Sequence, residues 1–526
     1  MYIQRINRKQ NGKVYTSIVL YRSYRQNGKQ KRETLATLTK WPKRIVGALE
    51  YALKNEKASH ITDFQFSQGK SFGGVYVLLE LCKKIGINHA LGRGKHLKTS
   101  LLQTIARVLN QGSQRSIIAW SDLNAIEEVL KISTPTMDNL YSNLDYLAKS
   151  QKRIENKLFK VTNKPQRANN IYLYDVTSSY LEGEHNELAE YGYNRDKKKG
   201  KKQIVIGLLC DEEGNAISTQ VFKGNTSDVS TFADQLHKVK TRFNCENVVM
   251  VGDKGMIKSA QIDSIEANGF KYITSISKLQ IKTLAKRGAI QFGLFDEELV
   301  EIQDGKNRYI LRRNPVRQKE TADTRKEKMN VIKRLCDNAR SYLKAHPRAK
   351  AETQLKRIAE KIKSLKLSKI MSISENENCI ELKIDEKILA EAELLDGCYA
   401  IKTNIEKETA SASTVHQRYK DLAKVESAFK NIKTECLEVR PIFLRKEERT
   451  KAHVFICMLA YNLVRHIRQK TSKLNITLAD VLDNLKAISY IIYDVKGFDI
   501  QQLPSKLSEK QYSILKALDI QLPKTL

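Results

Sequence analysis

Polar and apolar residues alternate near the N-terminus with the period expected of a half-buried strand. Residues 14–21 read Val-Tyr-Thr-Ser-Ile-Val-Leu-Tyr, and turn signals flank them at Gly12 and at Asn27-Gly28. We therefore expect a small and very basic β-hairpin unit over residues 1–45.

Apolar residues then recur three and four positions apart, which is the spacing of an amphipathic helix. The spacing is clearest at residues 75–81 and 101–109, and Ser133-Thr134-Pro135 marks the start of a further helix over Met137–Lys149. These patterns predict a helical region over residues 46–165.

From residue 166 the pattern changes to short apolar runs separated by turns and helices. The expected strands are Ile171–Thr177, Gln203–Cys210, Ala216–Phe222, Val248–Val251 and Tyr272–Ile276. The expected helices are Val229–Phe243 and Ser259–Ala267. Three meandering strands followed by alternating helices and strands are typical of a ribonuclease H-like sheet. The predicted fold class is therefore α/β, with a mixed sheet and flanking helices.

Residues 280–400 interrupt this alternation. Further strands are expected near 290–313 and at Cys379–Ile384 and Gly397–Thr403. Further helices are expected in the lysine-rich stretch near 318–367, at Ser413–Thr434 and near Lys451–Gln469. The chain closes with an amphipathic stretch, predicted to be a helical tail over residues 471–526.

The composition adds a strong charge imbalance to this picture. The 526 residues include 92 Lys and Arg against 59 Asp and Glu, which is a formal net charge of +33. A protein that handles a polyanion carries such an excess, because its cations replace the counterions condensed on phosphates. A basic surface that serves only solubility is the alternative. Hydrophobic residues make up 41%, enough for a sizeable core.

Targeting and metal-binding signals are few. The N-terminus has no apolar leader segment and no stretch of 18 apolar residues occurs, so we expect a cytoplasmic protein without membrane association. The eight cysteines form no Cys-x-x-Cys pair, which argues against a zinc ribbon and a disulfide framework. The nine histidines show no metal-ligand spacing, and His453, in an apolar run, is expected to be a core residue.

Three acidic residues stand out by their positions. Asp175 lies in the first strand of the expected sheet, Asp253 follows the fourth strand, and Glu426 lies on the late helix. Hydrolysis or transfer of a phosphodiester uses two divalent cations about 3.5–4 Å apart, and carboxylates from separate elements suit magnesium. An aspartate that only caps the loop after its strand is the alternative for Asp175 and Asp253.

The late helix places further polar groups near Glu426. Its apolar stripe consists of Leu422, Val425, Phe429 and Ile432. Tyr419, Glu426 and Lys433 are seven residues apart and are therefore expected on one line beside that stripe, about 21 Å long. A carboxylate between a phenol and an ammonium group suits a metal ligand with phosphate-contacting neighbours. A solvated face of a charged helix is the alternative.

Four short motifs are specific when taken together. They are Tyr174-Asp175-Val176-Thr177, Tyr191-Gly192-Tyr193-Asn194-Arg195-Asp196, Gly224-Asn225-Thr226-Ser227-Asp228 and Val251-Gly252-Asp253-Lys254-Gly255-Met256. With them the chain resembles the DDE transposases of bacterial insertion sequences, in the IS-four-like superfamily and its insertion-sequence 1634-type branch. The resemblance covers about residues 165–280 and 395–470 well.

The late helix of that family carries Tyr, Arg, Glu and Lys at a fixed spacing. Tyr419, Glu426 and Lys433 occupy three of those places in this chain. Leu422 stands at the place of the arginine, which puts one phosphate contact in doubt without touching the metal ligands.

The resemblance implies a catalytic and metal-binding triad of Asp175, Asp253 and Glu426. It implies two Mg²⁺ ions as cofactors, which Mn²⁺ is expected to replace. DNA contacts are expected at Tyr419, Lys433, Lys254, Lys198 and Lys201. For the lysine-rich loop at residues 197–202, a solvated loop without a DNA contact is the alternative.

The resemblance also divides the chain into six parts. They are the basic β-hairpin unit (1–45), a helical region for DNA binding or dimerisation (46–165), the first part of the ribonuclease H-like core (166–281), an insertion domain (282–395), the catalytic-helix part of the core (396–470) and the C-terminal helical tail (471–526). In some relatives the insertion supplies a tryptophan that stabilises a flipped base. This insertion has none, because the only two tryptophans are Trp41 and Trp120.

These features predict a bacterial, nucleoid-associated DNA transposase that cuts at the ends of an insertion sequence and joins them to a target. The expected partners are the terminal inverted repeats, target DNA and a second copy of the chain in a homodimeric synaptic complex. Two alternatives are kept. One is another metal-dependent nuclease of the same fold, such as a junction resolvase; the other is a non-catalytic DNA-binding protein descended from a transposase.

Overall fold

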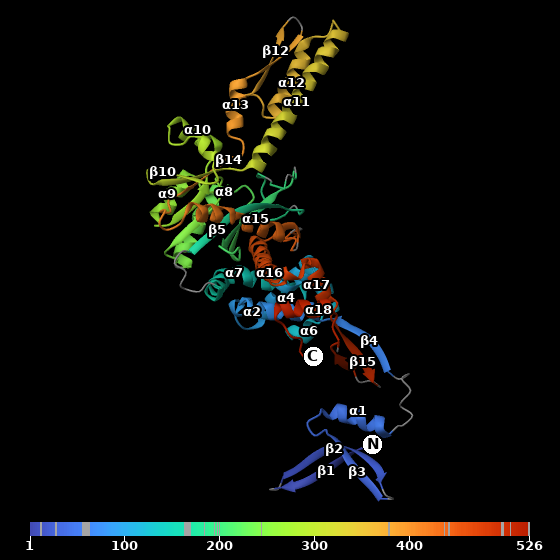
Figure 1. Ribbon diagram of the computed structural model, residues 1–526. Coiled ribbons are helices and arrows are strands. Elements are labelled where there is room, and N and C mark those ends of the chain that lie inside the picture. Colours follow the sequence, from blue (N-terminus) through green and yellow to red (C-terminus); the bar gives the residue numbers. More distant parts are fainter. Residues whose placement is uncertain are drawn as a thin grey trace.

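The structure is a computed structural model of the whole chain (Figure 1). It describes all residues except 11–12, 27–28, 55–63, 163–169, 184, 194, 197, 199, 244, 377–378, 436, 440–441, 496–498, 505 and 524–526. Among the helices of the described residues, none is both long and apolar enough to cross a membrane.

An eight-stranded mixed sheet forms the centre of the molecule, in the order β10-β11-β14-β9-β8-β5-β6-β7. Its strands are β5 (Asn170–Tyr180), β6 (Gln203–Asp211), β7 (Ala216–Lys223), β8 (Val248–Val251), β9 (Lys271–Ser275), β10 (Val300–Asp304), β11 (Asn307–Arg313) and β14 (Cys398–Thr403). Strands β5, β6 and β7 form an antiparallel meander, and β8 and β9 add to β5 in parallel. This order confirms the predicted ribonuclease H-like sheet.

Both faces of the sheet are covered, because side chains alternate between two apolar layers. On one face Tyr172, Tyr174 and Val176 pack with the buried residues of α8 (Asp228–His237) and α9 (Ser259–Ala267). On the other face Leu173 belongs to the largest cluster of buried residues, which contains the late helices. Strand β6 is therefore buried along its whole length.

A helical body packs against that second face. Its helices are α2 (Gly73–Lys84), α3 (Ile87–Leu91), α4 (Lys95–Leu109), α5 (Gln114–Leu123), α6 (Ile126–Leu130), α7 (Met137–Thr162), α16 (Glu447–Thr471), α17 (Leu478–Lys486) and α18 (Glu509–Leu518). Helix α16 contacts α4, α7 and β7, and α17 contacts α2. The predicted helical region and the C-terminal tail thus share one core.

The tail differs from the predicted all-helical one. It contains β15 (Ser489–Val495) and β16 (Asp499–Gln502), which form a three-stranded sheet with β4 (Phe64–Ser71). The partner strand lies more than 400 residues earlier in the chain. No local pattern could reveal that pairing.

The N-terminal unit has three strands where a hairpin was predicted. They are β1 (Tyr2–Gln10), β2 (Lys13–Gln26) and β3 (Lys29–Thr37), followed by α1 (Lys43–Lys54). Strand β3 reads Lys-Gln-Lys-Arg-Glu-Thr-Leu-Ala-Thr and is almost entirely exposed. It therefore lacks the apolar alternation by which a strand is predicted.

The predicted insertion divides into two parts. After α10 (Lys278–Lys286) and the short 3₁₀ helix η4 (Phe292–Asp296), β10 and β11 extend the central sheet. The remainder forms an arm, residues 314–397, which projects from the sheet (Figure 1). The arm comprises α11 (Pro315–Ala345), α12 (Ala351–Ser364), β12 (Met371–Asn376), β13 (Cys379–Ile384) and α13 (Glu386–Leu394). It has an apolar cluster of its own.

A buried carboxylate ties the helical body to the sheet. Glu155 of α7 is 1% exposed. It accepts hydrogen bonds from the Ser218 hydroxyl at 2.9 Å and from the Thr219 backbone N–H at 3.2 Å, both on β7. It also pairs with Arg242 in the π-helical turn η3 (Lys238–Arg242) that follows α8. Every acceptor oxygen of Glu155 therefore has a partner.

We expect Glu155→Ala to lower the free energy of unfolding by about 3–5 kcal/mol, because it leaves the Arg242 guanidinium largely buried without its counter-charge. Chemical denaturation of the full chain measures this change. The control is Glu360→Ala on α12, where the side chain is exposed, with an expected change within about 0.5 kcal/mol. Equal effects of the two variants would show that the ion pair does not stabilise the body.

Candidate active site

Two of the predicted acids are brought together by the pairing of β5 with β8. These strands are parallel, with Leu173 opposite Val251. Asp175 and Asp253 each follow two residues later, so they are level with each other: Asp253 lies just beyond the carboxyl end of β8, and Asp175 lies within β5. This is the edge of an α/β sheet at which ligands characteristically bind.

Asp253 begins the loop after β8. Its Oδ1 accepts hydrogen bonds from the backbone N–H groups of Gly255 at 3.0 Å and Met256 at 2.9 Å. The side chain nevertheless remains exposed. Asp253 therefore does cap its loop, the alternative raised from the sequence, while it still presents a carboxylate to solvent.

Asp175 is half-buried within β5. Burial raises its pKa to about 7, and the nearby carboxylates of Asp253 and Glu426 raise it too, against the lowering effect of the Val176 N–H and of Arg195. Asp253 and Glu426 are thus each close enough to Asp175 for their charges to act on it. A cation between such groups would offset those charges.

Glu426 reaches the same edge from the late helix. That helix is divided by Asp421 into α14 (Ala412–Lys420) and α15 (Leu422–Lys430), and it ends in a π-helical turn, η5 (Asn431–Glu435). Helix α15 packs on β5 and buries Val425, Ala428 and Phe429. Glu426 points away from that contact and is exposed. Leu422, which stands where the family carries an arginine, is half-buried against the core.

Tyr419 lies beside the acids, on α14. Burial raises the pKa of its hydroxyl, a hydrogen bond with Ser275 lowers it, and the carboxylates of Asp253 and Glu426 raise it. Ser275 is the last residue of β9, the next strand of the sheet after β8. The phenol therefore lies at the same edge of the sheet as the acids.

Lys433 is held inside the protein by polar contacts, two of which are with described residues. Its Nζ lies 2.7 Å from Asp196 Oδ1 and donates a hydrogen bond to Thr177 Oγ1 at 3.2 Å. Thr177 is two residues beyond Asp175 on β5 and shares its face of the sheet. The ammonium group is therefore near the acids, although its side chain is only 11% exposed.

The other predicted DNA contacts lie on loops around this edge. Lys254 follows Asp253 and is exposed. Lys201 pairs with Glu182 at 3.0 Å, and the Lys198 ammonium lies 6.0 Å from the centre of the Tyr180 ring. Residues 197 and 199 of that loop are outside the described residues.

Arg195 and Asp196 are site residues to which the sequence analysis assigned no role. The backbone N–H of Arg195 donates to the Ser178 hydroxyl at 3.0 Å, and its guanidinium pairs with Asp228 at 2.5 Å. Asp196 holds Lys433, as described above. Both residues belong to the quoted motif Tyr191–Asp196, which was the available signal.

The donor set suits a hard divalent cation, because all three acids supply carboxylate oxygens. Among the described residues, however, no group of three or more His, Cys, Asp or Glu side chains is arranged to hold a metal ion as it stands. The acids fit magnesium by donor type and because the charges of Asp253 and Glu426 act on Asp175.

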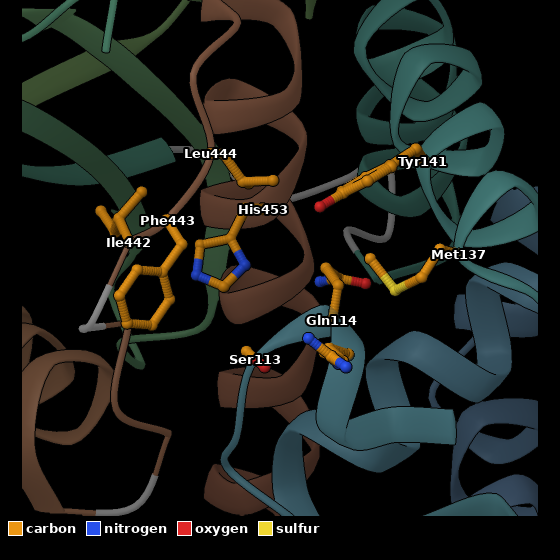
Figure 2. Close-up of a pocket in the computed structure, with 9 residues that line it drawn as sticks. Ser113, Gln114, Met137, Tyr141, Ile442, Phe443, Leu444 and His453 are labelled. Carbon is orange, nitrogen blue, oxygen red and sulfur yellow. The ribbon is translucent and has the colours of Figure 1, made fainter. Parts of the chain in front are cut away.

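A separate cavity of about 500 Å³ lies between the loop after the late helix and α5, α7 and α16 (Figure 2). His453 lines it and is 4% exposed, as expected of a core histidine. Its Nε2 donates to the Val439 carbonyl at 3.0 Å, whereas Nδ1 has no hydrogen-bond partner among the described residues. In Figure 2 the ring faces Gln114 and Tyr141 across the cavity.

A ribonuclease H-like sheet with acids on or just after neighbouring strands and on a late helix is an arrangement typical of enzymes that act on nucleic acids. The family model described as the Transposase DDE domain matches residues 166–463, more than half of the chain. A second model, the N-terminal domain of IS1634 family transposases, matches residues 3–63. The chain therefore belongs to the DDE transposases, of the IS1634 type, and is a DNA transposase.

Other comparisons add little. A search of curated proteins gave no match. Among solved structures, the chain is similar to a piggyBac transposase seen by cryo-electron microscopy in a synaptic complex with hairpin DNA. The two are 10% identical over 78% of each chain, with a TM-score of 0.35, a similarity that supports no inference about function.

We expect His453 to make stability depend on pH. Burial, with the nearby Arg107 charge, lowers its pKa to about 3, whereas an unfolded histidine titrates near 6.5. Stability from the neutral ring is present above pH ~6.5 and is lost as pH falls toward 3. At pH 5 the loss is about 2 kcal/mol.

Thermal unfolding between pH 7 and pH 4 tests this. His453→Gln should have a shallower dependence of Tm on pH than the wild type. His89→Gln, at an exposed position, should leave the dependence unchanged. Parallel curves for all three proteins would contradict the assignment.

Proposed function

We propose that this transposase cuts phosphodiester bonds at the ends of an insertion sequence and joins the freed 3′ ends to target DNA, with Asp175, Asp253 and Glu426 as its metal ligands. The observation that carries the proposal is the β5–β8 register, which makes Asp175 level with Asp253, while α15 packs on β5 and carries the exposed Glu426. Two Mg²⁺ ions, or Mn²⁺ in their place, would activate the attacking oxygen and stabilise the leaving oxygen.

The chemistry needs no covalent bond to the protein. In the first step a water oxygen bonds to phosphorus, the bond from phosphorus to the 3′ oxygen breaks, and that oxygen is released as a hydroxyl. In the second step this 3′ oxygen bonds to a target phosphorus and displaces a 3′ oxygen of the target. No external energy source is required, because the first step hydrolyses one phosphate ester and the second exchanges one phosphate ester for another, with the proton of the attacking 3′ hydroxyl ending on the displaced 3′ oxygen.

The neighbouring residues would orient the DNA. Tyr419 lies beside Asp253 and Glu426 and can contact the strand that enters the site. Lys433, fixed by Asp196 and Thr177, places a positive charge near Asp175 that favours a phosphate there. Lys254, Lys198 and Lys201 surround the same edge and supply further contacts to the backbone of the DNA.

The remaining parts of the chain would select and pair the ends. We assign recognition of the terminal inverted repeats to the basic unit (1–45) and the helical region (46–165), since the core contributes mainly phosphate contacts, which carry no sequence information. Synapsis of two ends calls for a homodimer. The core parts (166–281 and 396–470) perform the chemistry, flanked by the insertion (282–395) and the tail (471–526).

Single changes of Asp175, Asp253 or Glu426 to Ala should abolish cleavage and strand transfer. Loss of a direct ligand should cost more than the ~10–100-fold that loss of an outer partner of a metal site costs. The assay is cleavage of a labelled end-containing duplex in magnesium, with binding measured in parallel. Binding should survive, because removal of a negative charge lessens repulsion of DNA.

The matched control is Asp263→Ala, which removes an exposed carboxylate from α9 on the opposite face of the sheet. It should cleave as the wild type does. If Glu426→Ala still cuts while Glu435→Ala or Glu438→Ala does not, the assignment of the third ligand is wrong.

Lys433→Ala should slow cleavage by about tenfold or more without abolishing it, since a phosphate contact positions the substrate but makes no bond. Asp196→Asn separates this role from a structural one, because it removes the ion-pair partner and keeps the ammonium group. We expect Asp196→Asn to retain most activity. Equal losses in activity and in Tm for both variants would show that Lys433 serves only the fold.

A further inference from the structure

Positive charge is concentrated in the first part of the arm, because the whole arm (314–397) has 19 Lys and Arg against 14 Asp and Glu and its acidic residues gather in 370–397. The segment 315–369 contains 17 Lys and Arg and 6 Asp and Glu, an excess of 11. About a tenth of the chain therefore holds a third of the net charge of +33. Charge of this density makes a strong local field for a polyanion.

Most of these cations are not neutralised by the protein. Arg317, Arg325 and Arg340 form ion pairs with carboxylates. The other basic side chains of 315–369 have no carboxylate of the described residues within 4.0 Å. Their charges are thus available to a partner.

Three of these side chains lie on one line along α11. Lys319, Lys326 and Lys333 are seven residues apart and exposed, so they succeed one another at about 10.5 Å along the helix. Helix α11 packs against the rest of the arm through a different face. The buried residues of α11 are Met329, Ile332, Cys336, Ala339 and Leu343, and they belong to the arm's own apolar cluster. The lysine line, defined as Lys319, Lys326 and Lys333, is therefore not required for packing.

We infer that the lysine line is a docking surface for the backbone of duplex DNA, recognised without regard to base sequence. The inference rests on the transposase's action on DNA and adds a contact outside the catalytic edge. The ~10.5 Å interval between successive lysines of the lysine line is about three times the ~3.4 Å spacing of phosphate charges along one DNA strand. Lysine contacts phosphate as a point charge and reads no base.

Another copy of this chain does not fit the same surface. Each copy carries a net charge of +33, so two such surfaces repel one another. A polyanion gains instead, because each phosphate that pairs with a lysine releases condensed counterions.

The base of the arm is fixed to the catalytic sheet. Arg325 Nη2 lies 2.5 Å from both carboxylate oxygens of Asp396, and the Asp396 side chain is 3% exposed. The Asn314 N–H also donates to the Gly397 carbonyl at 2.9 Å. These contacts join the start of α11 to β14, which pairs with β9. DNA on the lysine line is thus held in a set orientation relative to the acids.

The test uses the full chain and a labelled duplex in EDTA, so that binding is measured without cleavage. The variant is Lys319→Gln/Lys326→Gln/Lys333→Gln. The control is Lys473→Gln/Lys506→Gln/Lys510→Gln, which removes the same charge from exposed positions of the C-terminal tail. Affinity is measured over a series of salt concentrations with an end-containing duplex and with an unrelated one.

We expect the arm variant to bind both duplexes about tenfold or more weakly, and its slope of log affinity against log salt to be shallower by about 2–3, at ~0.9 per lost phosphate contact. The control should keep the wild-type slope. If the triple variant has a lowered Tm, Lys326→Gln alone should still make the slope shallower by ~0.9.

Unchanged binding by the arm variant, or an equal loss in the control, overturns the inference. A loss confined to one of the two duplexes overturns recognition through the backbone. A wild-type protein that binds neither duplex contradicts the proposed function instead, so the two failures are distinguishable.

Discussion

The site depends above all on the parallel pairing of β5 with β8. Leu173 lies opposite Val251, so the two aspartates that follow them are level at one edge of the sheet. A shift of one residue in this register would turn one aspartate toward the opposite face and separate the pair. The apolar layers prevent such a shift, because Tyr172 and Tyr174 are committed to one layer and Leu173 to the other.

Much of this core could be predicted from local pattern. The run Val248–Val251 is short and wholly apolar, and Ser259–Ala267 is a helix ended by Asn268-Gly269, so both elements coincide with the structure. Elements without such a pattern were missed. Strand β3 is polar and exposed, and β4 pairs with β15 across most of the chain. Their strand character comes from hydrogen bonds with distant partners.

The chemistry of the site followed from motifs, whereas its shape did not. Asp175, Asp253 and Glu426 were predicted from their positions and from the resemblance. Their proximity agrees with that prediction; their role as ligands remains a proposal. The seven-residue spacing of Tyr419, Glu426 and Lys433 predicts that they lie on one line of a continuous helix. In the structure the helix is instead interrupted at Asp421 and ends in the π-helical turn η5. The partner of Lys433, Asp196, comes from a distant loop, and such a contact leaves no trace in helical periodicity.

The arm leaves the central sheet after β11 and returns at β14, and these strands pair with Arg313 opposite Cys398. The chain therefore leaves and re-enters the sheet at two residues that face each other on neighbouring antiparallel strands. The free-energy cost of closing a chain segment into a loop rises by only ~0.6 kcal/mol for each doubling of the length of the segment. This junction is thus a place where evolution can exchange, enlarge or delete a whole module while the catalytic sheet keeps its hydrogen bonds.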